Sequence, residues 1–267
     1  MARALLTLAL VTAGCSDTFP PSSLVTDLRV LGVRAEPPEI LPEQTARLEA
    51  LIVDPEGGGY AIAWRACDPA LLETDDPERD CAGESALALD ADADGAATFD
   101  PAAIAAAFGY EEALAKLDGE SVARVLVVLT VESGDKSVTA VKRVAVSRAE
   151  ARNRNPVVDA VGAPACLGGK DDPIAPAVPI ESFEVADKKR AVEVEGHETI
   201  EVRLYADAGR FDRARLELLW TPEGEPEPDE ASWSKGGDVA DETRFWAVAY
   251  DGRGGVAWRE ETAAPCR

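Results

Sequence analysis

Few side chains of this sequence have the types and spacing of a catalytic site. Its single histidine, His197, has no Ser or Cys nucleophile motif beside it. Adjacent acids such as Glu260 and Glu261 would suit a carboxylate-based glycan hydrolase. However, 50 of the 267 residues are Asp or Glu, so two neighbouring acidic residues say little about catalysis. We expect a protein that is not an enzyme; the alternative is a secreted glycan- or peptide-directed hydrolase with an unrecognised carboxylate site.

Alternating carboxylates form the most specific local motif: Asp90, Asp92 and Asp94, followed by Gly95. This spacing lets hard oxygens converge on Ca²⁺ as the backbone turns. A complete calcium loop ends in a bidentate Glu, where this sequence has Pro101 beside Asp100, and Asp100 also suits a helix cap. The four aspartates are therefore candidate calcium ligands, with an acidic surface turn as the alternative; no other cofactor is expected.

Trp233 lies in a polar stretch from Glu230 to Gly237, outside the predicted strands. A loop tryptophan can stack on a sugar ring, or it can fold down and cap the end of a sandwich. Trp233 is therefore a candidate ligand-stacking residue. Trp246 and Trp258 fall within predicted strands, as core residues or cross-strand partners.

Four cysteines follow Cys15 in the sequence, at positions 67, 81, 166 and 266. In an oxidising compartment an even number predicts two disulfides, with three possible connectivities. Zinc is the alternative, but none of these residues forms the C-x-x-C pair that zinc sites favour. We favour Cys67–Cys81 and Cys166–Cys266, because each pair falls within one of the domains described below.

Residues 1–14 have the features of a secretory signal. Arg3 supplies a positive charge, and the uncharged run from Ala4 to Ala13 is shorter than the roughly 20 residues that span a bilayer. Thr12-Ala13-Gly14-Cys15 resembles the lipobox of bacterial lipoproteins. This resemblance implies a diacylglycerol on the Cys15 thiol, cleavage before Cys15 and frequent acylation of the new amino group. In lipoproteins of this kind, Asp directly after the cysteine holds the protein at the inner membrane. Ser16 stands at that place in this sequence, so the resemblance implies sorting to the outer membrane.

The composition excludes several classes of partner. The net charge of -23 repels phosphate backbones, so nucleic-acid binding is not expected. Anionic membrane surfaces are excluded for the same reason, and membrane contact is expected only through the lipid. With 46% hydrophobic residues, the chain can bury a sizeable core.

Strand patterns occur in the same order in both halves. In the first half, strands are predicted from Asp27 to Arg34, Ala46 to Ile52 and Tyr60 to Trp64, and an apolar strand from Val122 to Val131 turns into residues 137–146. In the second half, they are predicted at 155–161, 200–206 and 216–220, and the apolar strand 245–250 is followed by a Gly-rich hairpin at 251–255. Short strands joined by turns indicate antiparallel sandwiches.

With Trp64 and Trp220 in the place of the core tryptophan, the chain resembles a bacterial lipoprotein with two tandem immunoglobulin-like domains of the immunoglobulin, fibronectin-III or cadherin type. The predicted fold is mainly β. Its parts are a lipidated tether at 15–26, domain 1 at 27–147 with a helical insertion near 100–118, a polar linker at 148–155, and domain 2 at 156–267. We expect a lipid-anchored envelope protein, on the periplasmic or surface face of the outer membrane, that acts as a binding, adhesion or spacer module with an envelope protein or glycan as its partner.

The lipid anchor gives a first prediction. Cys15→Ser should abolish acylation and partitioning into a detergent phase, because the Cys15 thiol is the expected lipid acceptor. Intact-mass measurement of the membrane-extracted protein checks this. An unmodified mature chain that is cut at another position would contradict it.

Overall fold

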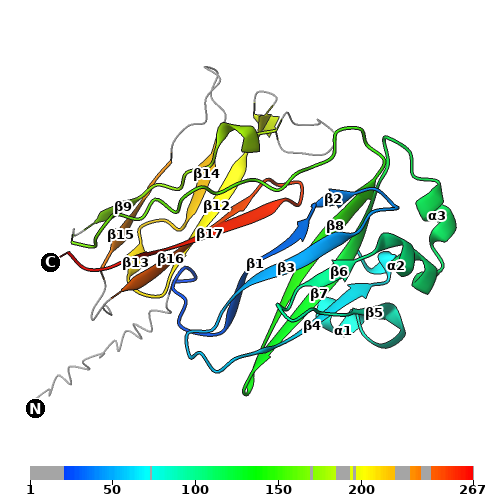
Figure 1. Ribbon diagram of the computed structural model, residues 1–267, viewed down its shortest axis with the longest axis horizontal. Helices are drawn as coiled ribbons and strands as arrows, with labels where there is room; N and C mark the ends of the chain where they lie inside the picture. The colour runs from blue at the N-terminus through cyan, green and yellow to red at the C-terminus, as the bar shows by residue number, and fades with distance from the viewer. Residues whose placement is uncertain are drawn as a thin grey trace, which may run out of the picture.

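The computed structural model describes residues 21–72, 74–168, 171–184, 193–194, 197–219, 229–235 and 242–266. It is mainly β with several antiparallel sheets, consistent with the predicted β-sandwich class. Strands of the first half lie on the right of Figure 1 and those of the second half on the left. Cys15, the predicted signal peptide and Trp220 lie outside the described residues.

The first sandwich consists of a three-stranded and a five-stranded sheet. Their orders are β1-β3-β6 and β2-β8-β7-β4-β5, in which only β2 and β8 pair in parallel. The strands are β1 (Arg29–Glu36), β2 (Glu39–Ile40), β3 (Ala46–Val53), β4 (Ala61–Cys67), β5 (Ala86–Leu89), β6 (Ala97–Phe99), β7 (Val122–Ser133) and β8 (Lys136–Ser147). Trp64 is buried in this core, as predicted, and its Nε1 donates to the Gly95 carbonyl oxygen at 2.9 Å.

A helical insertion lies between β4 and β7, at the far right of Figure 1. It contains α1 (Pro77–Asp80), α2 (Pro101–Phe108) and α3 (Glu111–Ala115), with short 3-10 turns at Pro69–Leu71 and Gly83–Ser85. Asp100 caps α2 by accepting from the backbone N–H groups of Ala102 and Ala103. Gly109 ends α2 with a φ of 76°.

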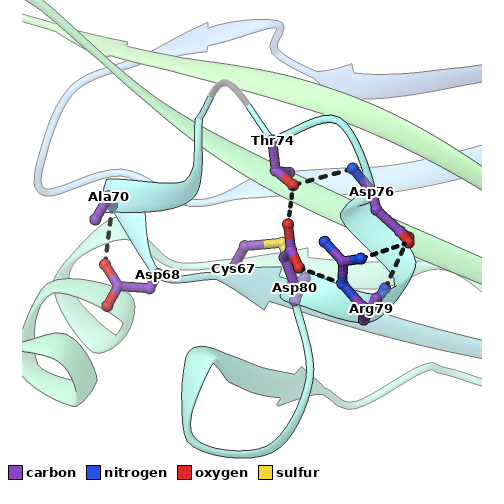
Figure 2. The surroundings of a disulfide bond; sticks show 8 residues. Cys67, Asp68, Ala70, Thr74, Asp76, Arg79 and Asp80 are labelled. Carbon is purple, nitrogen blue, oxygen red and sulfur yellow. Dashed lines mark hydrogen bonds and ion pairs between the residues drawn. A yellow bond between two sulfur atoms is a disulfide. The ribbon is translucent and has the colours of Figure 1, made fainter.

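Both favoured cysteine pairs are disulfide-bonded, with Cα–Cα distances of 5.1 Å for Cys67–Cys81 and 4.9 Å for Cys166–Cys266. Figure 2 shows the first bridge beside a polar turn in which Thr74 and Arg79 both contact Asp80. In the chain-entropy model, loops of these sizes contribute about 3 and about 4.7 kcal/mol to the free energy of unfolding. The longer loop ties the start of the second half to its end.

The second sandwich has a four-stranded sheet, β14-β12-β16-β17, and a three-stranded sheet, β13-β15-β9. Its strands are β9 (Asp172–Ile174), β12 (Ile200–Ala206), β13 (Arg210–Phe211), β14 (Arg215–Leu218), β15 (Ala231–Ser234), β16 (Thr243–Tyr250) and β17 (Val256–Ala263), with a small ribbon of β10 (Glu193–Val194) and β11 (His197–Glu198) and a 3-10 turn at Ile180–Ser182. Figure 1 shows these strands packed on the left of the molecule.

The strand predicted at 155–161 is wrong: only Ala160 makes an isolated bridge there. Side chains accept from some of its backbone donors, and the N–H of Asp159 donates to the Ala177 carbonyl oxygen at 2.9 Å. Val161 and Ala163 donate to the Glu261 carboxylate at 2.9 and 3.2 Å, and Val157 donates to Ser182 Oγ at 2.9 Å. The edge of the sandwich is occupied by β9 instead.

Of the expected tether at 15–26, the described residues 21–26 join the fold before β1 begins. Leu24 bridges Ala206 of the second sandwich, and Val25 is 1% exposed. Among the described residues, no helix is both long and apolar enough to cross a membrane.

Gly209 gives a prediction on stability. Its φ is +72°, and an added Cβ would lie 2.3 Å from Cζ2 of the buried Trp233. Gly209→Ala should therefore lower the free energy of unfolding by about 3 kcal/mol, because overpacking adds to the left-handed backbone strain. Urea unfolding of residues 16–267 measures this.

Gly134→Ala is the matched control. Its φ is +62°, but nothing lies within 4 Å of an added Cβ. It should cost only the left-handed strain, about 1 kcal/mol. Equal losses in the two variants would contradict the packing argument.

Candidate functional site

An apolar cluster joins the two sandwiches, and we call it the junction cluster. Its fully buried members come from the N-terminal segment, β1, β3, β16 and β17: Val25, Leu31, Val53, Trp246, Val248 and Val256. Leu51, Tyr205, Tyr250 and Trp258 pack against them. In Figure 1, β1 and β17 lie side by side where the halves meet. The halves thus share a buried core between them.

Close backbone approach at Gly32 makes this packing possible. A Cβ at Gly32 would lie 3.1 Å from Val248 Cγ1 and 3.5 Å from Trp258 Cε3. The Arg34 guanidinium stacks over the Trp258 ring, 4.4 Å from its centroid. The absence of a side chain at residue 32 therefore lets β1 rest directly on β16 and β17.

A polar hairpin locks the junction next to this cluster. Asp251 Oδ1 accepts from the backbone N–H groups of Arg253, Gly254 and Gly255 at 2.8–2.9 Å. Asp251 Oδ2 accepts from Asn153 Nδ2 at 2.8 Å, and the backbone N–H of Asn153 donates to Glu39 of the first sandwich at 2.9 Å. The segment 148–155, predicted as a polar linker, is thus bonded to both halves around a buried Asn153.

A cleft of about 480 Å³ opens beside the junction cluster, and we call it the junction cleft. Its walls come from β1, β8, β12, β16 and the hairpin after β16. Lys142, Arg143 and Arg203 line it, and none of its described lining residues is Asp or Glu. In a chain with a net charge of -23, a lining with cations and without carboxylates differs from the rest of the sequence.

Lys142 is the most unusual of these cations, because its side chain is buried. It is 7% exposed, and its ammonium donates to the Gly254 carbonyl oxygen. Burial lowers the pKa of Lys142 to about 8, while Asp251 opposes this by favouring the charged form. At neutral pH the cleft therefore contains a poorly hydrated ammonium group.

Tyr250 of β16 and Arg203 of β12 form another part of the lining. Tyr250 Oη donates to the Leu31 carbonyl oxygen at 3.1 Å, and burial raises the pKa of Tyr250 to about 12. Its ring lies 4.8 Å from the Arg203 guanidinium, which also pairs with Glu201 at 2.6 Å. This wall combines an aromatic surface with an exposed, planar cation.

The candidate calcium ligands do not converge. Asp92 Oδ2 pairs with Arg47 at 2.6 Å, its Oδ1 accepts from the N–H groups of Asp94 and Ala96, and Asp100 caps α2. Asp90 and Asp94 lie in the same turn, but no group of three or more metal-ligating side chains occurs within the described ranges. The arrangement matches the acidic surface turn, which Arg47 ties to β3.

The stacking hypothesis for Trp233 is wrong. Trp233 lies on β15, is 0% exposed and donates from Nε1 to the Ala208 carbonyl oxygen at 3.0 Å. Its ring packs edge-on against Phe245, with centroids 5.4 Å apart. It is a core residue of the second sandwich, so neither ring face is open to a sugar.

The acidic pairs considered for hydrolysis have structural partners. Glu260 accepts from Trp246 Nε1 at 2.9 Å, and Glu261 accepts from two backbone N–H groups. Glu198 is 1% exposed, contacts Arg253, and has its pKa raised to about 8 by burial. His197 Nδ1 lies 3.2 Å from the Phe183 carbonyl oxygen. These contacts give each group a role in the fold.

Lys142 is not among the site residues predicted from the sequence, although the sequence contains a signal for it. Strand residues at alternate positions share a face, so Lys142 belongs with Val138, Ala140, Val144 and Val146. A lysine in that row is predicted to point toward the interior. The pattern does not reveal Arg203 and Tyr250, because they come to line the same cleft as Lys142 only when the two halves pack together.

The buried ammonium gives a prediction on stability. The folded pKa of about 8 lies below the usual 10.5, so between these values only the unfolded chain keeps the proton. Below pH 8 the buried charge lowers the free energy of unfolding by the full amount, about 3 kcal/mol. This destabilisation disappears as the pH rises through 10.5. Lys142→Met should therefore raise the free energy of unfolding at pH 7 by about 1–2 kcal/mol, after losing one hydrogen bond worth about 1 kcal/mol.

Urea unfolding of wild type and variant at pH 7 and pH 10 checks this, and the variant's advantage should shrink at pH 10. Lys116→Met, which removes an exposed lysine paired with Glu112, should show no such pH-dependent difference. A Lys142→Met protein that is less stable than wild type by the same amount at both pH values contradicts the argument.

Several solved structures align with this chain at low sequence identity. No family model and no curated protein matches the chain. The alignment with the crystal structure of murine CEACAM1b covers 89% of this chain and 99% of the CEACAM1b chain, at 8% identity and a TM-score of 0.25. The alignment with Escherichia coli alpha-2-macroglobulin activated by porcine elastase covers 90% of this chain and 22% of the macroglobulin chain, at 12% identity and a TM-score of 0.26.

The alignment with a structure from a 1.5-MDa bacterial ice-binding adhesin covers 90% of this chain and 65% of the adhesin chain, at 8% identity and a TM-score of 0.27. At these scores the alignments carry no argument about function.

Proposed function

We propose that this chain is a lipid-anchored, non-catalytic envelope protein that binds its ligand in the junction cleft. The observation that supports this is the cleft itself. It is about 480 Å³ in volume, within the range of small-ligand sites, and lies where two domains meet, which is a favoured place for such sites. The junction cluster and the Asp251 hairpin hold its walls in place.

The position of the anchor supports a site close to the membrane. Ser23 lies eight positions after Cys15, and its carbonyl oxygen accepts a hydrogen bond from the backbone N–H of Ala206 at 3.0 Å. A chain of this length reaches at most about 29 Å. A lipid on Cys15 thus keeps the junction close to the membrane that carries it. This suits capture of a compact ligand in the envelope better than adhesion to a distant surface.

The carboxylates favour binding over hydrolysis. A glycosidase of the usual kind needs two carboxyl groups that flank a bond of the substrate. In the described structure, Glu198 is buried against Arg253, and Glu260 and Glu261 hold an indole and two backbone groups. Freeing any of these carboxylates would break contacts that stabilise the fold before two of them could come together as a reactive pair.

The test screens residues 16–267 by ligand-observed NMR against a library of neutral and charged fragments. Val141, 43% exposed, lines the cleft, so Val141→Trp should weaken binding of most hits at least tenfold by filling its mouth. Val157→Trp is the control, because Val157 is 50% exposed and lies outside the cleft lining. Bound fragments should be recovered chemically unchanged.

Equal binding to wild type and Val141→Trp would place the ligand elsewhere and contradict the proposal. Turnover of a library member that stops on substitution of a carboxylate would overturn its non-catalytic part.

A further inference from the structure

The charge around the junction cleft restricts its ligand. Lys142 and Arg203 are the cations that line it with free donor capacity, because the guanidinium of Arg143 donates to the Leu72 carbonyl oxygen at 3.3 Å. Asp251 favours the charged form of Lys142, and Glu201 pairs with Arg203. Glu201 is shared with Arg215 at 2.5 Å, so it neutralises Arg203 only in part. The cleft therefore presents two cationic groups, and no Asp or Glu is among its described lining residues.

Lys142 supplies a charge that the fold leaves without an ion pair. Its hydrogen bond goes to a backbone carbonyl, and no described carboxylate lies within 4.0 Å of its ammonium. An ammonium has three N–H donors, so Gly254 engages one of them. A buried charge is costly unless it is paired, and an anion that enters the cleft would supply the pair.

Arg203, which lines the same cleft from β12, can complete the anion site. Its guanidinium is exposed at the surface and rests on the Tyr250 ring. A planar guanidinium matches the two oxygens of a carboxylate. A dianion such as phosphate meets more repulsion than a monoanion from the net charge of -23 and from Asp251 and Glu201.

The rest of the lining is apolar or aromatic. Val30, Val33 and Val141 come from the first sandwich, and Tyr205 and Tyr250 from the second. Such walls bury the body of a ligand while a few polar groups fix its orientation. Glycines of the Asp251 hairpin form the remaining side and leave room for a ring or a short alkyl chain.

We infer that the junction cleft binds a ligand with a single carboxylate on an apolar or aromatic body, with Lys142 and Arg203 as its anchors. This inference rests on the proposed function. The carboxylate has two possible sources: a free organic acid, or the C-terminus of a peptide that ends in an apolar residue.

Matched acids and amides test the charge requirement directly. The probes are 3-phenylpropionate and 3-phenylpropionamide, and the peptide Ala-Ala-Phe with a free or an amidated C-terminus. Each is titrated into residues 16–267 at pH 7. We expect the acid of at least one pair to bind at least tenfold more tightly than its amide. The pair that shows the larger ratio identifies the source of the carboxylate.

Two variants assign the binding to the proposed anchors. Lys142→Met should weaken acid binding at least tenfold and leave amide binding within twofold. Arg203→Gln should act in the same direction, and because Arg203 is exposed this variant keeps the buried packing. Lys116→Met removes the same charge from the exposed surface of the helical insertion and should change neither affinity.

The outcomes separate the two proposals. Acids and amides that bind equally, or acid binding that survives Lys142→Met, overturn the carboxylate inference. The proposed function stands in that case if neutral fragments still lose affinity in Val141→Trp. If no probe and no fragment binds at the cleft, both proposals fail.

Discussion

Burial of β16 on both faces is the constraint on which the rest of the structure depends. Phe245, Ala247 and Ala249 point into the core of the second sandwich, whereas Trp246 and Val248 point into the junction cluster. A strand that is apolar on both faces must be covered twice. Its own sandwich covers one face, and β1 of the first sandwich covers the other. The two halves are therefore held in one arrangement, and the junction cleft is a consequence of it.

Much of the fold follows from local patterns. Alternation predicts β3 and β12, continuous apolar runs predict β7 and β16, and Asp100 with Pro101 predicts the start of α2. These signals depend on residues close together in the chain. The sequence also shows that β16 is apolar throughout, but it does not show what covers the second face. That information depends on Gly32, more than two hundred residues earlier, whose small size admits Val248 and Trp258.

The wrong predictions share a physical cause, which is pairing between groups that lie far apart in the chain. Residues 155–161 have strand-like side chains, yet Glu261 and Ser182 accept from some of their backbone donors. Trp233 sits among polar neighbours, yet its strand pairs with β9 and β13 and buries the ring. Local polarity predicts a loop in the second case because it does not report a partner strand. The candidate site was missed for the same reason, since β8 supplies Lys142 and β12 supplies Arg203.

A buried lysine without an ion pair weakens the fold, so its presence needs a compensating benefit. The hydrogen bond to Gly254 offsets only part of the cost of burial. A methionine of similar length would fill the same space without the charge. The Asp251 hairpin places the Gly254 carbonyl where it orients the ammonium at the cleft wall, and Asn153 in turn orients Asp251. A costly charge that is held in position beside a cleft is the pattern of a binding site whose ligand supplies the missing counter-charge.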